Sequence, residues 1–372
     1  MIITKETAPH IRRKATVARM MTDVLIALAP TLIFSFVVFP LQTLSTYLIS
    51  IFVMVGAEFV YVGLRNMMPN DGQKHSFKER FAYAYKGKYT INNVLSPLIS
   101  AIIFTLIMPA GAPIYAVVAG ALFGIVIGKL VFGGLGSNIF NPAAVGMLFS
   151  KLCFGSQYKA VSTWFYNLPE DATAAATALG NGGALVNNLN DYPLLDLFLG
   201  RVPGTLGEVY KITIIIGLIY LLIRRSADFR IVVSFLLTFI LLSLVAGLSE
   251  MSIDNAVNPL YFMLYNLLSG GVLFGITFML TDPVTSPINA PSRIIYGMVA
   301  AVLTLFIRLF AAMPEGMGFS ILISNMIAVV LDHYEWSNSR YTWKKFLAMG
   351  LIFVLSSLVM FLVIRYGGVY NA

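Results

Sequence analysis

A run of small and hydroxyl side chains in the longest polar stretch of the chain is its clearest candidate for covalent chemistry. The run is Asp171-Ala-Thr-Ala-Ala-Ala-Thr-Ala-Leu179, in which Thr177 follows the acid by six positions. A threonine hydroxyl in such a polar stretch can accept a covalently attached group. An alanine-rich run also favours a short surface helix, which Gly180-Asn-Gly-Gly183 would end. Both interpretations stay open at this point.

Two polar interruptions between apolar segments form a second candidate site. Each combines Gly or Pro with Asn, Asp, Ser and Thr, so its backbone can leave the helix and turn its polar groups toward a ligand. Either segment alone could be a tight turn with ordinary helix caps. Their parallel positions in the two halves favour a shared ligand site, as in transporters built from two repeats. The candidate contact residues are Gly133, Gly134, Asn138, Asn141, Pro142, Thr281, Asp282 and Thr285.

Charged residues inside apolar segments are costly and usually functional. Lys129 and Arg308 are near the ends of their segments, where a long side chain can reach the interface. Glu58 has a short stem, so it is the better candidate for ion coupling, as a cation site or as half of a buried pair. Asp23 is expected to cap the first helix, where its negative charge would interact favourably with the positive end of the helix dipole.

The elements that carry these residues are predicted from composition. Of 372 residues, 58% are hydrophobic and 11% charged, whereas a soluble domain has about 25% charged residues. Apolar runs near the ~20 residues that cross a bilayer recur, and in lipid such runs must be helices. We therefore expect an all-α polytopic membrane protein of about ten or eleven spans, four of them short. The spans are predicted at 23–39, 44–64, 94–108, 114–132, 139–155, 209–223, 229–248, 260–280, 293–311, 317–331 and 346–364.

Basic residues gather in loops that fall on one side of these spans, namely the N-terminal segment, 65–93, 224–230 and 332–345. The positive-inside rule makes that side cytoplasmic and places 156–208 outside. The predicted organisation is a cytoplasmic segment 1–22, a first repeat 23–155, an outer loop 156–208 and a second repeat 209–372.

Several function classes are excluded or disfavoured. The basic residues that give the net charge of +8 lie in loops between the predicted spans, where they set the orientation of the protein in the membrane. Nucleic-acid binding is therefore not expected. The single Cys153 rules out an intramolecular disulfide and an iron–sulfur cluster held by this chain alone. The three histidines have no metal-ligand spacing. Because no phosphate-binding or dinucleotide motif is present, NAD(P)H would bind another subunit.

Together these features resemble the D subunit of the Rnf complex, which is similar to the B subunit of the sodium-translocating NADH:quinone reductase. The resemblance rests on Phe140-Asn-Pro-Ala143, on Thr281-Asp-Pro-Val-Thr285 and on the threonine motif. The flavinylation pattern of this family is Asp, two variable residues, Ser or Thr, usually Gly, and then Ala-Thr. Asp171, Ala176 and Thr177 match it, whereas alanines occupy the positions of the hydroxyl residue and the glycine. Thr173 is a minor rival acceptor.

The resemblance implies a membrane electron carrier in a bacterial or archaeal cytoplasmic membrane. Such a complex passes electrons between reduced ferredoxin and NAD⁺ and couples this to Na⁺ or H⁺ transport. Its expected architecture is urea-transporter-like, with two related helical repeats and some interrupted helices. A flavin transferase would attach FMN to Thr177 on the outer side. A second, non-covalent flavin such as riboflavin would lie in the helices, between the two interrupted segments.

Two alternatives remain at this stage. Spans that begin near residue 23, without a long soluble extension before them, favour the Rnf branch over the quinone-reductase branch. A channel or facilitator for a small polar solute is the alternative from another class, since Asn141-Pro-Ala143 and Asn289-Ala-Pro291 are similar to paired pore motifs. A channel would be colourless, whereas a redox subunit would be yellow.

Overall fold

The computed structural model describes residues 16–67, 76–158, 193–202, 204–251, 257–311, 316–333 and 340–366. Within these ranges the secondary structure is helical, with no β-strand. The predicted class of an all-α polytopic membrane protein is therefore confirmed. The flavinylation motif, with Asp171, Ala176 and Thr177, lies outside the described residues.

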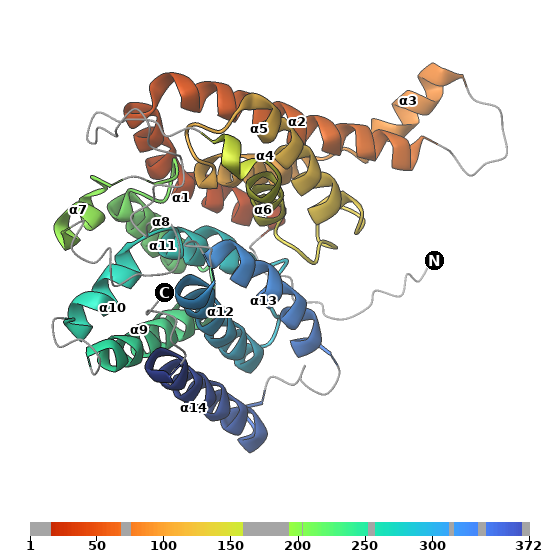
Figure 1. Cartoon of the computed structure of the whole chain (residues 1–372). Coiled ribbons are helices and arrows are strands. Elements are labelled where there is room, and N and C mark those ends of the chain that lie inside the picture. Colours follow the sequence, from red (N-terminus) through yellow and green to blue (C-terminus); the bar gives the residue numbers. More distant parts are fainter. Residues whose placement is uncertain are drawn as a thin grey trace.

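The first half of the chain builds one group of helices, coloured red to yellow in Figure 1. Two long helices come first, and shorter ones follow. The fifth α-helix ends in a π-helical turn, η1, and a short 3₁₀ turn, η2, follows the sixth. The elements are α1 (Val17–Val38), α2 (Pro40–Asn66), α3 (Phe77–Tyr85), α4 (Ile91–Ile107), α5 (Ile114–Ile125), η1 (Val126–Leu130), α6 (Pro142–Phe154) and η2 (Gly155–Gln157).

The second half, green to blue in Figure 1, contains a broken helix. Helix α10 and the following α11 with its π-helical turn η4 meet at an angle of 54°. The elements are α7 (Leu194–Leu199), α8 (Lys211–Arg224), α9 (Phe229–Met251), α10 (Pro259–Leu268), α11 (Val272–Gly275), η4 (Ile276–Leu280), α12 (Ala290–Phe310), α13 (Met317–Leu331) and α14 (Trp343–Tyr366).

Helix length separates full spans from partial ones. By length and composition, five described helices can cross a membrane (α1, α2, α9, α12 and α14), or six if the bent pair is one span. The predicted spans at 94–108, 139–155, 209–223 and 317–331 correspond to helices of 17, 13, 14 and 15 residues. All four are shorter than the ~20 residues of a full span, as the sequence predicted. The remaining expected spans are thus partial or bent helices.

Glycines bring α5 and α6 into backbone contact and so position the segment between them. A Cβ on Gly124 would lie 2.5 Å from the carbonyl oxygen of Pro142, and one on Gly146 would lie 2.6 Å from that of Gly120. Small residues at such spacing allow membrane helices to approach closely. A larger side chain at either glycine would push the two helices apart, and with them the start of α6.

Two backbone-accepted hydrogen bonds connect segments of the chain that are far apart in the sequence. At one end of the bundle, Arg65 Nη1 donates to the carbonyl oxygen of Gly133 at 2.8 Å. At the opposite end, the Gly207 N–H donates to the Leu106 carbonyl oxygen at 2.7 Å. Which end faces the cytoplasm stays a prediction.

Asp23 does not cap the first helix, so that prediction was wrong. The N-cap of α1 is Thr16, whose side chain accepts the N–H of Arg19. Asp23 lies nearly two turns further on, where its carboxylate forms an ion pair with Arg224 at 3.1 Å and accepts the Ser226 hydroxyl at 2.8 Å. The acid therefore joins α1 to the end of α8, a long-range pairing that the local sequence does not reveal.

Candidate functional site

The two interrupted segments share one construction. Each begins where a helix ends in a π-helical turn, η1 before the first segment and η4 before the second. Each ends at an asparagine in the N-cap position, with a proline in the first turn of the next helix. Asn141 caps α6 by accepting the N–H groups of Ala143 and Ala144 at 3.0 and 3.4 Å, and Asn289 occupies the N-cap of α12. The repetition supports a common role for the two segments.

Different devices hold the two loops in shape. The first relies on glycine, because Gly133, Gly134 and Gly136 have φ angles of 112°, 92° and 86°, which other L-residues rarely adopt. The second relies on a carboxylate. Asp282 accepts the Val284 N–H at 3.2 Å and the Thr285 hydroxyl at 3.3 Å, forming an Asx-type turn.

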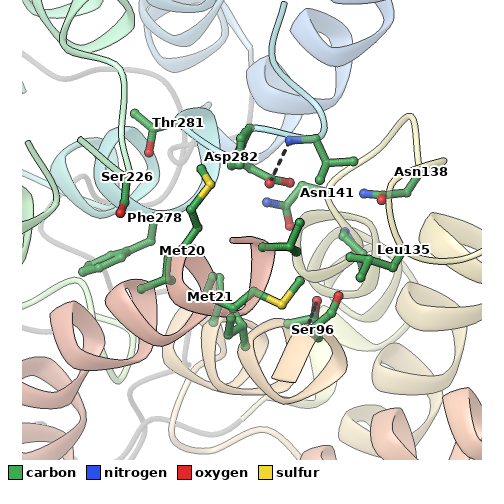
Figure 2. A pocket seen from close by; sticks show the side chains of 18 of the residues that line it. Met20, Met21, Ser96, Leu135, Asn138, Asn141, Ser226, Phe278, Thr281 and Asp282 are labelled. Carbon is green, nitrogen blue, oxygen red and sulfur yellow. Dashed lines mark hydrogen bonds between the residues drawn. The ribbon is translucent and has the colours of Figure 1, made fainter. Parts of the chain in front are cut away.

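A cavity of about 450 Å³ lies between the two loops. Its volume falls within the range of small-molecule and cofactor sites. Figure 2 shows side chains of both interrupted segments around it, with methionines of α1 on another side. Its walls come from α1, α4, η1, η4, the residues that follow α8, and the two loops. Five residues predicted for the shared site line it, namely Asn138, Asn141, Pro142, Thr281 and Asp282.

The other three predicted residues shape the loops from outside the cavity lining. The carbonyl of Gly133 accepts from Arg65, and the N–H of Gly134 donates to the carbonyl of Lys129 at 3.2 Å. The hydroxyl of Thr285 is bonded to Asp282 and is buried. These three residues therefore affect the cavity indirectly, by positioning other residues of the site.

Glu58 forms half of a buried ion pair, one of the two roles expected for it. Its Oε2 lies 2.9 Å from Nζ of Lys129, and both side chains are 1% exposed. Lys129 also donates to the Ser96 hydroxyl at 2.9 Å. The expectation that Lys129 reaches the interface was wrong, because η1 directs its ammonium inward between α2 and α4. Lys129 and Ser96 line the cavity, whereas Glu58 does not.

A comparison with protein families matches residues 4–339 to a single family, described as the NQR2, RnfD, RnfE family. The chain belongs to this NQR2, RnfD, RnfE family. The resemblance inferred from the sequence is thereby confirmed at the level of the family. The family description covers both branches that the sequence left open, so it does not choose between them.

Curated proteins similar to this chain include several named as the B subunit of a Na(+)-translocating NADH-quinone reductase. The protein of Chromohalobacter salexigens is 36% identical over 68% of this chain and 60% of its own length. That of Ectopseudomonas mendocina is 33% identical over 63% and 58%, and that of Klebsiella pneumoniae is 34% identical over 68% and 61%. The chain thus spans about 60% of the length of these relatives.

One side of the cavity was missed from the sequence. Asn92, Ser96 and Ser100 lie on α4 at intervals of four residues, and all three line the cavity. Within the described residues, Oδ1 of Asn92 is buried without a hydrogen-bond partner, which is a costly state that a ligand could relieve. Polar residues every fourth position in an apolar helix mark one face. That spacing could have revealed this stripe.

A second buried cation lies away from the cavity, at the break between α10 and α11. Arg308 is 1% exposed. Its guanidinium donates to the carbonyl oxygens of Asn266 at 2.5 Å and Ser269 at 3.3 Å. Lys211 donates to the carbonyl of Gly270 at 2.7 Å in the same place. The expectation that Arg308 reaches the interface was therefore wrong, because its charge binds the C-terminal carbonyls of α10, where cations are favourable.

The described residues offer no cluster of three or more His, Cys, Asp or Glu side chains that could hold a metal ion. The polar groups around the cavity are instead amides, hydroxyls, one ammonium and one carboxylate. This set suits an organic ligand with both hydrogen-bond donors and acceptors.

Proposed function

We propose that this chain is a membrane electron-transfer subunit of an ion-translocating oxidoreductase complex. Family membership over residues 4–339 carries the proposal. The names of the curated relatives favour a B-type subunit of a sodium-translocating NADH:quinone reductase over the ferredoxin:NAD⁺ type that the sequence analysis preferred. The chain would be inactive alone and would work with the other subunits of its complex.

Thr177 is the proposed attachment point of FMN, through a phosphoester that a flavin transferase forms outside the cytoplasmic membrane. The match of Asp171, Ala176 and Thr177 to the family pattern supports this assignment. Under ultraviolet light, a denaturing gel should show a fluorescent flavin band that is lost in Thr177→Ala and kept in Thr173→Ala. Equal fluorescence of the two variants would reject Thr177 as the acceptor, and a colourless wild-type protein would favour the channel.

The cavity is the proposed site of a second, non-covalent flavin such as riboflavin. Its residues fit the ring of such a molecule. The buried Asn92 Oδ1 can accept an imide N–H, the Lys129 ammonium can donate to a ring carbonyl, and Met20 and Phe278 supply apolar walls. A bound flavin would supply one-electron chemistry, while the side chains orient it and exclude water.

Ser100→Phe tests this site by filling the cavity from α4. Non-covalent flavin, released by denaturation and measured by chromatography, should fall from about one per chain to near zero. The covalent band should stay unchanged. Ser45→Phe makes the same substitution on an exposed face of α2 and should keep both flavins. Retention of the released flavin in Ser100→Phe would place it elsewhere.

The type of complex is tested on inverted membrane vesicles that contain it. The reductase proposal predicts NADH-driven quinone reduction that Na⁺ stimulates. The Rnf type would instead reduce NAD⁺ with ferredoxin. Ferredoxin-dependent activity without NADH:quinone activity would reject the branch proposed here and leave the electron-transfer role intact.

Orientation is part of the same proposal. In a Cys153→Ser background, a cysteine at Asn181 should react with an impermeant maleimide in intact cells. A cysteine at Ser76 should react only after lysis. The opposite labelling pattern would reverse the proposed topology and contradict attachment of FMN to Thr177 on the outer side.

A further inference from the structure

We propose that helix α3 is a surface anchor that binds anionic phospholipid headgroups next to the end of α2. The helix projects from the bundle, beyond the main group of helices in Figure 1. It closes its own N-terminus with a capping box, in which the Ser76 N–H donates to Glu79 Oε2 at 2.9 Å. A helix that caps itself in this way is specified locally. The proposal is independent of the electron-transfer role.

One face of α3 is aromatic, but α2 covers only half of it. Phe77, Phe81, Ala84 and Tyr85 follow the spacing of one helix face. At the C-terminal half, Ala84 is buried and the Tyr85 ring stacks on Phe59 at 4.4 Å. At the N-terminal half, Phe77 is 68% exposed and Phe81 is 46% exposed. A surface of this kind needs a covering partner.

The exposed N-terminal half of the aromatic face of α3 is continuous with the apolar surface that α2 presents to lipid. Phe52, Val60 and Leu64 are strongly exposed on α2, and an exposed apolar face on a membrane-spanning helix contacts acyl chains. Tyr85 connects the two helices, since its ring contacts Phe59 on α2 and Phe81, at 4.7 Å, on α3. The aromatic row therefore extends from the lipid-facing part of α2 past its end, where aromatic residues favour the membrane interface.

The positive charges around this aromatic row favour lipids with anionic headgroups. Lys78, Lys86 and Lys88 are exposed, and the Lys88 ammonium lies 3.5 Å from the ring centroid of Tyr83. The one acidic side chain between Ser76 and Thr90 is Glu79, which serves in the capping box. A basic amphipathic helix with aromatic side chains binds a bilayer surface that contains anionic lipid. An acidic protein could use the lysines, but continuity with the lipid-facing row of α2 favours a bilayer.

Spin labels on the full-length protein test the proposal. In a Cys153→Ser background, Phe81→Cys is labelled on the aromatic face and Ala82→Cys on the exposed neighbouring face. Each is reconstituted in phosphatidylcholine vesicles with or without phosphatidylglycerol. Collision with oxygen and with a water-soluble nickel complex then reports immersion. The label at 81 should favour oxygen, and more strongly with phosphatidylglycerol, while the label at 82 should favour nickel.

Phe77→Cys gives a second label on the aromatic face, in case Phe81→Cys disturbs α3. Equal nickel access at positions 77, 81 and 82 in both lipid mixtures would overturn the proposal. Loss of access to both oxygen and nickel at 77 and 81 in the assembled complex would also overturn it, because a protein partner would then cover the row.

The basic residues have their own test. In the Phe81→Cys protein, Lys78→Gln with Lys86→Gln and Lys88→Gln should abolish the additional immersion that phosphatidylglycerol causes. Lys344→Gln removes an exposed charge from a loop predicted on the same side and should leave the effect unchanged. A full response to phosphatidylglycerol in the triple variant would mean that these lysines do not bind the anionic headgroups.

Discussion

Lys129 and Arg308 are buried to the same extent, each with 1% of its side chain exposed, but they lie in different places. Lys129 lies beside the cavity and contacts a carboxylate and a hydroxyl, both on flexible side chains. Arg308 lies away from the cavity, at the end of α10, where it donates to the carbonyls of Asn266 and Ser269 and to the Ser269 hydroxyl. Burial alone therefore does not distinguish a cation that stabilises the fold from one available to a ligand. Position relative to the cavity does, since Lys129 lines it and Arg308 does not.

Side-chain chemistry explains why each residue type suits its place. A guanidinium is a planar fork with fixed donors, which matches the carbonyls of a helix that ends at a break. An ammonium has three rotatable donors. Among the described residues, Lys129 contacts Glu58 and Ser96, which leaves one N–H for the cavity that it lines. The comparison assigns a structural role to Arg308 and a role at the site to Lys129.

The largest effect is expected from breaking the buried pair. Lys129→Met leaves the Glu58 carboxylate buried without its counter-charge, which costs about 3–5 kcal/mol. The double variant with Glu58→Gln should recover much of that loss, because it removes both charges. Thermal unfolding in detergent, followed by size-exclusion chromatography, measures both. An unchanged unfolding midpoint in Lys129→Met would show that the pair contributes little to stability.

Glu58→Gln alone separates stability from ion coupling. A structural pair predicts poor assembly, because the ammonium then lacks its carboxylate. A coupling site predicts normal assembly and flavin content with reduced ion transport. Full assembly together with transport at the wild-type rate over a range of Na⁺ concentrations would exclude both roles for Glu58.

The next effect concerns the broken helix. Arg308→Met leaves carbonyls of Asn266 and Ser269 without their donor, at about 1–3 kcal/mol for each unsatisfied group. Arg308→Lys should recover only part of the loss, because it keeps the charge and loses the fork. Lys344→Met, an exposed control, should leave the unfolding midpoint unchanged. If Arg308→Met unfolds at the same midpoint as that control, Arg308 does not stabilise the fold. The proposed difference between the two buried cations would then be lost.

The smallest effect tests the partners of Lys129 directly. Ser96→Ala removes one hydrogen bond and should cost about 1 kcal/mol. Ser100→Ala is its matched control, since Ser100 lies one turn further along the same wall and, among the described residues, donates to the Ser96 backbone carbonyl. Only Ser96→Ala should also change the absorption spectrum of a bound flavin, through the reoriented ammonium. Identical flavin absorption spectra in the two variants would show that Lys129 does not contact the bound flavin.

Much of the architecture was accessible from the sequence because periodicity and composition report it locally. Apolar run lengths predicted the helical class and the four short helices. The parallel composition of the loops around Asn141 and Asp282 predicted that they would meet, and the structure places a cavity between them. Basic-residue counts predict which loops share a side of the membrane, and that topology stays a prediction.

The errors came from tertiary context. Whether Lys129 or Arg308 reaches the interface depends on which helix packs beside it, and the chain segments that bind them are far away in the sequence. Asp23 was assigned to a local cap, whereas its partner Arg224 follows about two hundred residues later. Asn92 was different, because its four-residue spacing from Ser96 and Ser100 was visible in the sequence.

The π-helical turns that precede both loops set the direction in which the following residues point. In η1 the N–H of Val131 reaches back to the carbonyl of Val126, one residue further than in an α-helix. Such a turn contains one residue more than an α-helical turn, which rotates everything after it by about 100° relative to an uninterrupted α-helix. Deleting Ile127 would restore the α-helical count and turn Lys129 away from both Glu58 and the cavity. Because η4 precedes the second loop in the same way, both loops begin with this change of direction.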